Sequence, residues 1–208
     1  MRMHVVVMAA TKGGVGKSTL AAAFAVAAFE EGAKVALIDL DPQDSVTDWH
    51  ELRGSPENPR LLAGDSLAAS LATARGGGVE WVFVDTPPAI LNIIEPAVRQ
   101  ADLVVIPVRP SPLDILAIDP IVTLCEEHKR ACVFLLNQVP PRTAFAEEAA
   151  KQLKKDGKVL GVSIASRNSF AMAMTTGKTA PEVERGDGKA REEIAAAWAA
   201  IKRLLKVK

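Results

Sequence analysis

Three features that would each point to a particular class of protein are absent from the sequence. Lys and Arg together number 25, as do Asp and Glu, so the chain has no net charge with which to attract nucleic acid or an anionic membrane. It has two cysteines, Cys125 and Cys132, without a Cys-x-x-Cys pair or a histidine cluster, which argues against a zinc site, an iron–sulfur cluster or a redox pair. The first apolar run, residues 5–10, is too short for a signal peptide or a membrane span, so we expect a cytoplasmic protein.

The remaining composition is that of one soluble domain. The chain has 208 residues, of which 49% are hydrophobic and 24% are charged, and this is enough to bury one large core. Two stretches rich in glycine, proline or serine, residues 54–59 and 76–78, indicate loops but are too short for a domain linker. We therefore predict a single domain over residues 1–208.

Short apolar runs alternate with longer helical patterns along the whole chain. Several runs consist almost entirely of Val, Ile, Leu or Phe, as a strand that is buried on both faces requires. This alternation is typical of βαβ units, and it predicts a three-layer α/β/α fold in which helices cover both faces of a mostly parallel, twisted sheet. The predicted strands are 4–9, 34–39, 81–85, 103–108, 132–137 and 159–162, and the predicted helices are 17–31, 45–53, 66–75, 90–101, 113–129, 144–156 and 191–206.

A glycine-rich turn lies between the first predicted strand and the first predicted helix. Such a turn directs several backbone N–H groups into one concavity, where the helix dipole adds positive potential, and this combination binds phosphate. Gly13, Gly14 and Gly16 allow a close approach that a Cβ would block. Lys17 can reach the β- and γ-phosphates, and the Ser18 hydroxyl can bind Mg²⁺. The predicted nucleotide-binding segment comprises Lys12, Gly13, Gly14, Val15, Gly16, Lys17, Ser18 and Thr19.

Three aspartates lie at the ends of predicted strands, at the edge of the sheet that also carries the glycine-rich turn. Asp39 and Asp41 lie at the carboxyl end of the second strand, and Asp85 ends the third. Hydrolysis of ATP requires a bound metal and a positioned water molecule, and carboxylates serve both purposes. We therefore predict that these side chains face a bound nucleotide. Each of them could instead form a turn or cap the helix that follows.

The glycine-rich turn departs from the usual P-loop pattern in two ways. Thr11 occupies the position of the first glycine, and Lys12 stands directly before the double glycine. In this form the turn resembles the deviant Walker A loop of the ParA/MinD family of ATPases, which have a P-loop NTPase fold. The resemblance implies that the chain binds Mg-ATP and that Lys12 crosses a dimer interface to touch the phosphates bound by the other subunit.

Two further segments are similar to the same family. Residues 39–43 resemble its Asp-x-Asp-Pro-Gln segment, and residues 85–88 resemble its Walker B segment and second switch. The resemblance implies that Asp41 orients the attacking water, that Asp39 supports the metal shell, and that Asp85 holds Mg²⁺ through water. The predicted catalytic residues are thus Lys12, Lys17 and Asp41, and the predicted metal-binding residues are Ser18, Asp39 and Asp85.

The resemblance extends with less specific motifs through the rest of the chain. Residues 101–108 resemble the next strand, and Asn137 matches an asparagine that approaches the adenine ring, but an asparagine at a strand end is equally a turn former. Three residues precede the first strand, so we expect no N-terminal helix-turn-helix domain, and the chain is similar to the small plasmid-type ParA partition proteins. A weaker pattern of the family matches Ile164, Arg167, Phe170, Ala173 and Gly177.

Basic residues gather near the end of the chain, although the chain as a whole is neutral. Sequence-independent binding of DNA depends on Lys and Arg side chains that contact phosphates, and a dimer doubles any such patch. The same residues could instead form an ordinary solvated helix face with cations near its C-terminus. Arg109 and Arg142 follow strand ends and could serve DNA, a partner protein or the dimer interface. The predicted DNA contacts are Arg167, Lys178, Lys202, Arg203 and Lys206.

These features favour a nucleotide-switched positioning ATPase. The resemblance implies that ATP brings two subunits together, that the dimer binds nonspecific DNA and so associates with the nucleoid, and that a ParB-like or other adaptor protein stimulates slow hydrolysis. Its cargo would be a plasmid, a chromosome or another large assembly. One alternative is a membrane-associated regulator similar to MinD, which is disfavoured because the last helix is poor in bulky apolar anchors. The other is a metabolic P-loop enzyme such as an amide ligase, which would need an acceptor pocket that no motif identifies.

Overall fold

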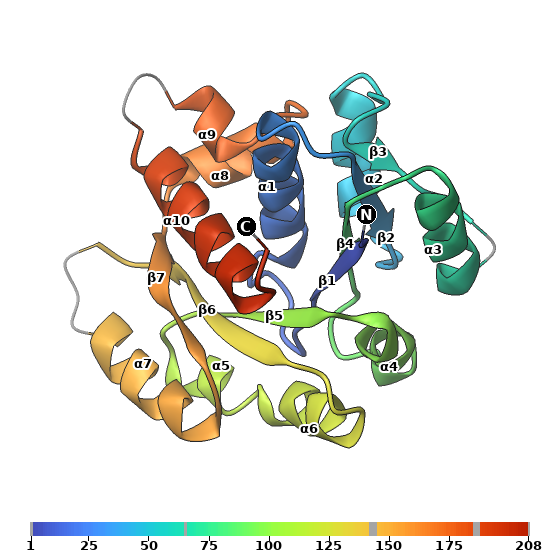
Figure 1. Ribbon diagram of the computed structural model, residues 1–208. Coiled ribbons are helices and arrows are strands. Elements are labelled where there is room, and N and C mark those ends of the chain that lie inside the picture. Colours follow the sequence, from blue (N-terminus) through green and yellow to red (C-terminus); the bar gives the residue numbers. More distant parts are fainter. Residues whose placement is uncertain (1, 65, 142–144, 185–187, 208) are drawn as a thin grey trace.

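Seven parallel strands form one central sheet (Figure 1). The computed structural model describes residues 2–64, 66–141, 145–184 and 188–207. The strand order is β3-β2-β4-β1-β5-β6-β7, so β1 lies in the middle between β4 and β5. The predicted α/β fold with a mostly parallel sheet is confirmed. The strands are β1 (His4–Met8), β2 (Val35–Asp39), β3 (Arg60–Leu61), β4 (Trp81–Asp85), β5 (Leu103–Val108), β6 (Cys132–Val139) and β7 (Val159–Ala165).

Helices cover both faces of the sheet and form two outer layers (Figure 1). Side chains alternate along β1, where Val6 and Met8 belong to one hydrophobic core and Val5 and Val7 to the other. Because both faces are covered, every residue of β1 and β4 is buried. The first core packs against α1 (Lys17–Glu30), α2 (Ser45–Leu52), α8 (Asn168–Met174) and α10 (Lys189–Leu204), and the second against α3 (Leu67–Gly76), α4 (Leu91–Gln100), α6 (Asp119–Glu127) and α7 (Phe145–Asp156).

The prediction of one helix over residues 113–129 is wrong. The segment forms two helices, α5 (Pro112–Ile115) and α6. Pro120 lies in the first turn of α6, where a helix tolerates proline, but its ring would clash with the carbonyl of residue 116 if a single helix continued. Between α5 and α6, the Ala117 carbonyl accepts a hydrogen bond from the hydroxyl of Thr11, which lies in the turn after β1.

Three short elements were not predicted from the sequence. β3 has two residues at the edge of the sheet, and α8 and α9 (Ala180–Val183) follow β7, which runs to Ala165 rather than to residue 162. These elements are too short to show a periodic apolar pattern, and tertiary contacts hold them in place. The predicted start of a helix at residue 144 lies outside the described residues. Among the described helices, none is both long enough and apolar enough to cross a membrane.

The carboxyl ends of the central strands bring two predicted site residues together. In the register of the sheet, Asp39 of β2 lies beside Asp85 of β4, and Asp85 lies beside Met8 of β1. The glycine-rich turn follows β1 and leads directly into α1. The turn and both aspartates therefore meet at one edge of the sheet, which is the edge where open α/β sheets bind ligands.

Candidate functional site

Two glycines shape the turn between β1 and α1. Gly14 has a φ of 70° and Gly16 a φ of 94°, and residues with a Cβ rarely adopt this left-handed conformation. Gly16 is the N-cap of α1 and has no side chain that could bond to the first amides of the helix, so these amides can serve a ligand. Lys17 begins α1 and is buried, whereas Lys12 is exposed. Lys17 is thus placed for phosphates bound by its own turn, and Lys12 is accessible to a second molecule.

Two side chains at the end of β6 hold the turn in place. Asn137 donates a hydrogen bond of 2.7 Å from Nδ2 to the Val15 carbonyl, and Gln138 donates one of 2.7 Å from Nε2 to the Gly14 carbonyl. A Cβ on Gly16 would lie 2.3 Å from Nδ2 of Asn137, so a side chain at this position would displace the amide group that bonds to the Val15 carbonyl. The amide group of Asn137, predicted to approach adenine, bonds to the turn in this structure. Gln138 was not predicted, and its place directly after Asn137 at a strand end is the one signal that could have indicated it.

Asp85 is completely buried next to the start of α1. Its Oδ2 accepts a hydrogen bond of 2.5 Å from Ser18 Oγ, and its Oδ1 accepts one of 3.1 Å from the Thr86 amide. Burial raises the pKa of Asp85 to about 7. The charge of Asp39 also raises this pKa, while the Ser18 hydrogen bond and the charge of Lys17 lower it. A carboxylate beside a hydroxyl suits Mg²⁺, which prefers oxygen ligands, and a cation there would offset the cost of burying the carboxylate.

The two aspartates at the carboxyl end of β2 have different surroundings. Asp39 accepts hydrogen bonds from the amides of Val46 (2.9 Å) and Thr47 (3.0 Å) in the first turn of α2, and from the Asp41 amide (3.1 Å). Burial raises the pKa of Asp39, and these hydrogen bonds limit the rise. Asp41 is buried, and its Oδ1 accepts a hydrogen bond of 3.0 Å from the Gln43 amide. Because the carboxylate of Asp39 caps α2, its metal-binding role stays a prediction.

Two adjoining cavities at this edge of the sheet have the size of a nucleotide site. A groove of about 610 Å³ runs along the glycine-rich turn and is bounded by α2 and α8. A second cavity of about 300 Å³ lies among the ends of β6 and β7 and α8. Gly16 and Thr19 line both cavities, so the two adjoin at the start of α1. The groove is lined among others by Lys17, Ser18, Asp41 and Trp49, and the second cavity by Asn137, Gln138, Ser166, Arg167 and Phe170.

The basic residues predicted to contact DNA fall into two groups. Two of them are already paired with carboxylates of the protein, which reduces their attraction for phosphates. Arg167 donates hydrogen bonds of 2.5 and 2.6 Å to the two carboxylate oxygens of Glu193, and Lys202 Nζ lies 2.7 Å from Glu31. The other three are exposed, and within the part of the chain that the structure describes no acidic side chain forms an ion pair with them: Lys178, Arg203 and Lys206.

The two arginines that follow strand ends were predicted to serve DNA, a partner or a dimer interface. Arg109, after β5, donates hydrogen bonds of 3.0 and 2.8 Å from Nε and Nη2 to Oδ1 of Asp114. Asp114 belongs to α5 and is buried, so this pair fixes α5 against the end of β5. Arg142 lies outside the described residues.

The segment that carries the site matches a known family. The profile of the CobQ/CobB/MinD/ParA nucleotide-binding domain matches residues 6–180, which contain the glycine-rich turn, all three aspartates and Asn137. The chain belongs to this family. The predicted relationship to ParA/MinD ATPases is thereby confirmed, and the residues that bound both cavities lie within the family domain.

Individual members of the ParA/MinD group cover different shares of the chain. ParA from Rhizobium radiobacter is 37% identical over 114 residues, 54% of this chain and 51% of that protein, so the chain matches about half the length of that relative. Maintenance of carboxysome distribution protein A from Gloeobacter kilaueensis is 34% identical over 206 residues, 90% of this chain and 92% of that protein. The septum site-determining protein MinD from Pyrococcus horikoshii OT3, solved as a complex with Mg-ADP, has a TM-score of 0.75 at 15% identity and covers 98% of this chain and 97% of its own. This last likeness shows the shared fold.

Replacing Gln138 with leucine is expected to weaken the binding of Mg-ATP by roughly 5-fold, because one hydrogen bond contributes about 1 kcal/mol. The substitution removes the bond to the Gly14 carbonyl and so loosens the turn. The measurement is the Kd of a fluorescent ATP analogue with Mg²⁺. Gln152→Leu is the matched control, since Gln152 bonds to Glu148 within α7. Equal affinities for the two variants would contradict the supporting role of Gln138.

Proposed function

We propose that this protein is a Mg-ATP-dependent ATPase of the ParA type, which positions or segregates a plasmid, a chromosome or another cargo. ATP brings two subunits together, the dimer binds nonspecific DNA, and an adaptor protein similar to ParB stimulates slow hydrolysis. One observation carries the proposal: four polar side chains converge at the start of α1 beside a nucleotide-sized groove, with an exposed lysine next to them. The four are Lys17, Ser18, Asp41 and Asp85, and the exposed lysine is Lys12.

In this proposal the groove holds the triphosphate and the adjoining cavity holds the nucleoside. The amides of the turn and the ammonium group of Lys17 bind the β- and γ-phosphates. Ser18 and Asp85 hold Mg²⁺, which when bound neutralises part of the phosphate charge. Asn137 and Phe170 line the adjoining cavity and offer the base a polar group and an apolar wall.

Hydrolysis of ATP requires positioning and charge rather than covalent chemistry from the protein. Asp41 orients the attacking water, because this residue lines the groove and the Gln43 amide holds its carboxylate. Lys12 of the second subunit adds positive charge at the phosphates. A site completed by two subunits hydrolyses ATP only in the dimer.

Exposed apolar side chains at the same edge of the sheet support a face-to-face dimer. Leu113 and Leu116, which follow β5, are 70% and 73% exposed, and Met172, which follows β7, is 66% exposed. Ile90, which follows β4, is 37% exposed. Exposed apolar side chains that lie close together mark interaction surfaces, whereas single exposed ones are common on any protein surface. Because these residues and Lys12 all follow the carboxyl ends of strands, one dimer interface can bury them and bring Lys12 to the second nucleotide.

The experiment that tests this function measures retention on nonspecific duplex DNA with no nucleotide, ADP, ATP, and ATP with Mg²⁺. We expect retention only with ATP, a decline with rising salt because binding releases counterions, and loss of retention in Lys12→Ala. Lys154→Ala is the control, since Lys154 is exposed on α7. Failure to bind DNA in every state would refute the DNA-binding part of the proposal. Nucleotide-dependent binding to anionic vesicles instead would favour a membrane-associated regulator.

A further inference from the structure

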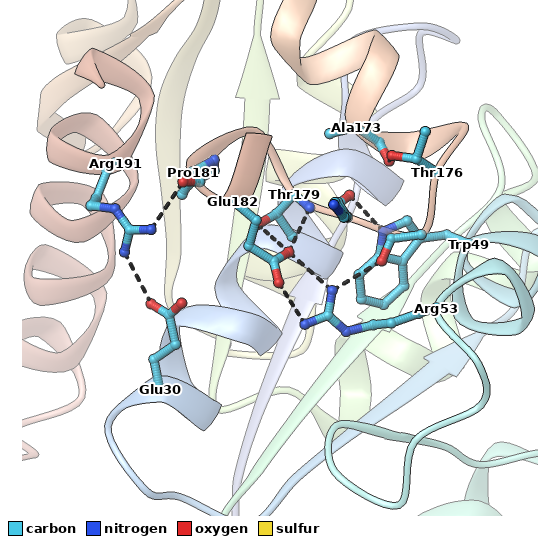
Figure 2. A network of polar contacts seen from close by, with 11 residues as sticks. Glu30, Trp49, Arg53, Ala173, Thr176, Thr179, Pro181, Glu182 and Arg191 are labelled. Carbon is cyan, nitrogen blue, oxygen red and sulfur yellow. Dashed lines mark hydrogen bonds and ion pairs between the residues drawn. The ribbon is translucent and has the colours of Figure 1, made fainter. Parts of the chain in front are cut away.

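Polar contacts join the C-terminal end of α2 to α9 and to the segment that precedes α9 (Figure 2). Arg53 donates from Nη1 to the Gly177 carbonyl at 2.9 Å, and its Nη1 and Nη2 donate to the two carboxylate oxygens of Glu182 at 2.9 and 2.8 Å. Trp49 donates from Nε1 to the Lys178 carbonyl at 2.8 Å. We call this set of five residues the α2–α9 contact.

The ion pair in this contact is more constrained than an ordinary surface pair. The side chains of Arg53 and Glu182 are 17% and 23% exposed, and their two parallel hydrogen bonds fix the orientation of both. Glu182 also accepts hydrogen bonds of 2.7 and 2.9 Å from the amide and hydroxyl of Thr179, so it caps α9 at the same time. Burial acts to raise the pKa of Glu182, but the hydrogen bonds from Arg53 and Thr179 outweigh burial and hold this pKa below its ordinary value.

The backbones of the two segments also touch. Gly177 has a φ of 65°, and a Cβ on it would lie 2.3 Å from the amide nitrogen of Arg53 and 2.4 Å from the carbonyl carbon of Leu52. No side chain fits at these distances without a shift of the backbone. Gly177 also ends the weaker family-like pattern of the sequence, and it does not line the nucleotide groove. The close approach of α2 is the physical reason for glycine at this position.

The α9 side of the contact is held in place by two long helices. The Pro181 carbonyl accepts a hydrogen bond of 2.9 Å from Nη2 of Arg191 in α10, and Nη1 of Arg191 lies 3.5 Å from Glu30 at the end of α1 (Figure 2). A helix of four residues such as α9 has little stability of its own. The bonds to Arg191 fix the position of α9, and α9 in turn contacts the C-terminal end of α2.

At its other end, α2 is joined to the turn that carries Asp41. Asp39 bonds both to the first amides of α2 and to the Asp41 amide. With eight residues, α2 is too short to be stable in isolation, so its position depends on tertiary contacts. Val46 and Trp49 pack into the first core, and the polar contacts join the two ends of the helix to the Asp41 turn and to the α9 side. A shift of its C-terminal end would therefore move the turn and, with it, the carboxylate of Asp41.

We propose that Arg53 and Glu182 are positioning residues for ATP hydrolysis, because they fix α2 so that Asp41 faces the groove. This inference rests on the proposed function, in which Asp41 orients the attacking water. Trp49 and Leu52 of α2 line the groove, but neither Arg53 nor Glu182 is among its lining residues in the described part of the chain. Their removal thus acts on turnover more than on binding. A remote change that displaces a reacting group by about 1 Å can slow a reaction about 100-fold.

The test compares Arg53→Gln, Glu182→Gln and the double variant in steady-state ATP hydrolysis. We expect kcat to fall about 10-fold or more in each single variant, while the Kd of Mg-ATP changes by less than about 3-fold. The kcat of the double variant should be no lower than that of the slower single variant, because both substitutions break the same contact. Arg53→Lys keeps the charge but not the paired hydrogen bonds, so its kcat should be intermediate. Arg99→Gln, which removes the exposed pair with Glu95 in α4, is the control and should leave kcat unchanged.

Combination with Asp41→Ala decides whether the effect passes through Asp41. In this slow background, Arg53→Gln should cause no further loss of kcat. A further loss by the same factor, or a parallel loss of ATP affinity in Arg53→Gln alone, would overturn the proposal, because either result indicates general destabilisation. Arg53→Lys provides the same comparison if Arg53→Gln does not fold.

Failure of this inference can be told apart from failure of the proposed function. If Asp41→Ala slows hydrolysis while Arg53→Gln does not, the positioning role of Arg53 is wrong and the proposed function stands. If the wild type does not hydrolyse ATP, or if Asp41→Ala leaves its turnover unchanged, the proposed catalytic role of Asp41 is wrong, and the positioning role is overturned with it.

Discussion

Replacing Lys17 with alanine is expected to lower the affinity for Mg-ATP by at least about 100-fold, because hydrogen bonds to charged groups contribute about 1.5–3 kcal/mol each. Lys17 is 5% exposed and begins α1, so its ammonium group is held beside the glycine-rich turn rather than in solvent. Burial lowers the pKa of Lys17, and the charges of Asp85 and Asp41 oppose this effect. A triphosphate in the groove would add the opposite charge that a buried ammonium group needs.

The Kd of Mg-ATP is measured by calorimetry for the wild type, Lys17→Ala and Lys17→Met. Methionine keeps the apolar part of the lysine side chain, so an equal loss in both variants shows that the charge, and not the packing, binds the phosphates. Lys34→Ala is the control. Lys34 is exposed and directly precedes β2, so it lies at the amino ends of the strands, away from the glycine-rich turn. Tight binding by Lys17→Ala would contradict the assignment of the turn as the nucleotide site.

The place of the candidate site could be predicted because it depends on local patterns and on parallel topology. Continuous apolar runs predicted the central strands, and in a parallel sheet the carboxyl ends of such strands share one edge. The structure accordingly places Asp39 beside Asp85 and the glycine-rich turn next to both. The spacing of the glycines was sufficient to single out Lys17 and Ser18.

Pairings between residues far apart in the sequence could not be predicted. Arg167 is paired with Glu193 and Lys202 with Glu31, so two of the five predicted DNA contacts are already satisfied within the protein. The α2–α9 contact is of the same kind, and so is the bond from Gln138 to the turn. Such contacts depend on tertiary distances, and no periodic pattern along the chain records them.

The boundaries of short elements were missed for a different reason. Pro120 stands inside the predicted helix 113–129, and a proline within a helical pattern commonly ends the helix. The signal for the break between α5 and α6 was therefore present, but the apolar periodicity of the whole segment outweighed it. The two residues of β3 and the four of α9 are too few for any pattern to emerge.

Replacing Asp85 with asparagine is expected to abolish ATP turnover and to stabilise the protein when neither nucleotide nor Mg²⁺ is present. Burial raises the pKa of this carboxyl group from 3.8 to about 7, and this shift corresponds to at most about 4 kcal/mol of lost stability above pH 7. Asparagine can accept only one of the hydrogen bonds from Ser18 and Thr86, which reduces the gain by about 1 kcal/mol. We therefore expect a net gain of about 3 kcal/mol.

The gain should depend on pH in a defined direction. The folded protein keeps a proton on Asp85 up to about pH 7, whereas the unfolded chain releases it near the ordinary pKa of 3.8. The stability contributed by this group is therefore fully present below about pH 4, is lost as the pH rises to about 7, and stays lost above that. Asparagine has no proton to release, so the advantage of the variant should grow from about pH 4 to about pH 7 and then level off.

Urea unfolding of the magnesium-free protein at several pH values measures this difference in the free energy of unfolding. Asp156→Asn is the control, because Asp156 is exposed at the end of α7. A variant that is no more stable than the wild type near pH 8 would show that Asp85 is not a destabilising buried charge. Greater stability combined with lost turnover would mean that the wild type keeps the buried carboxylate for a cation.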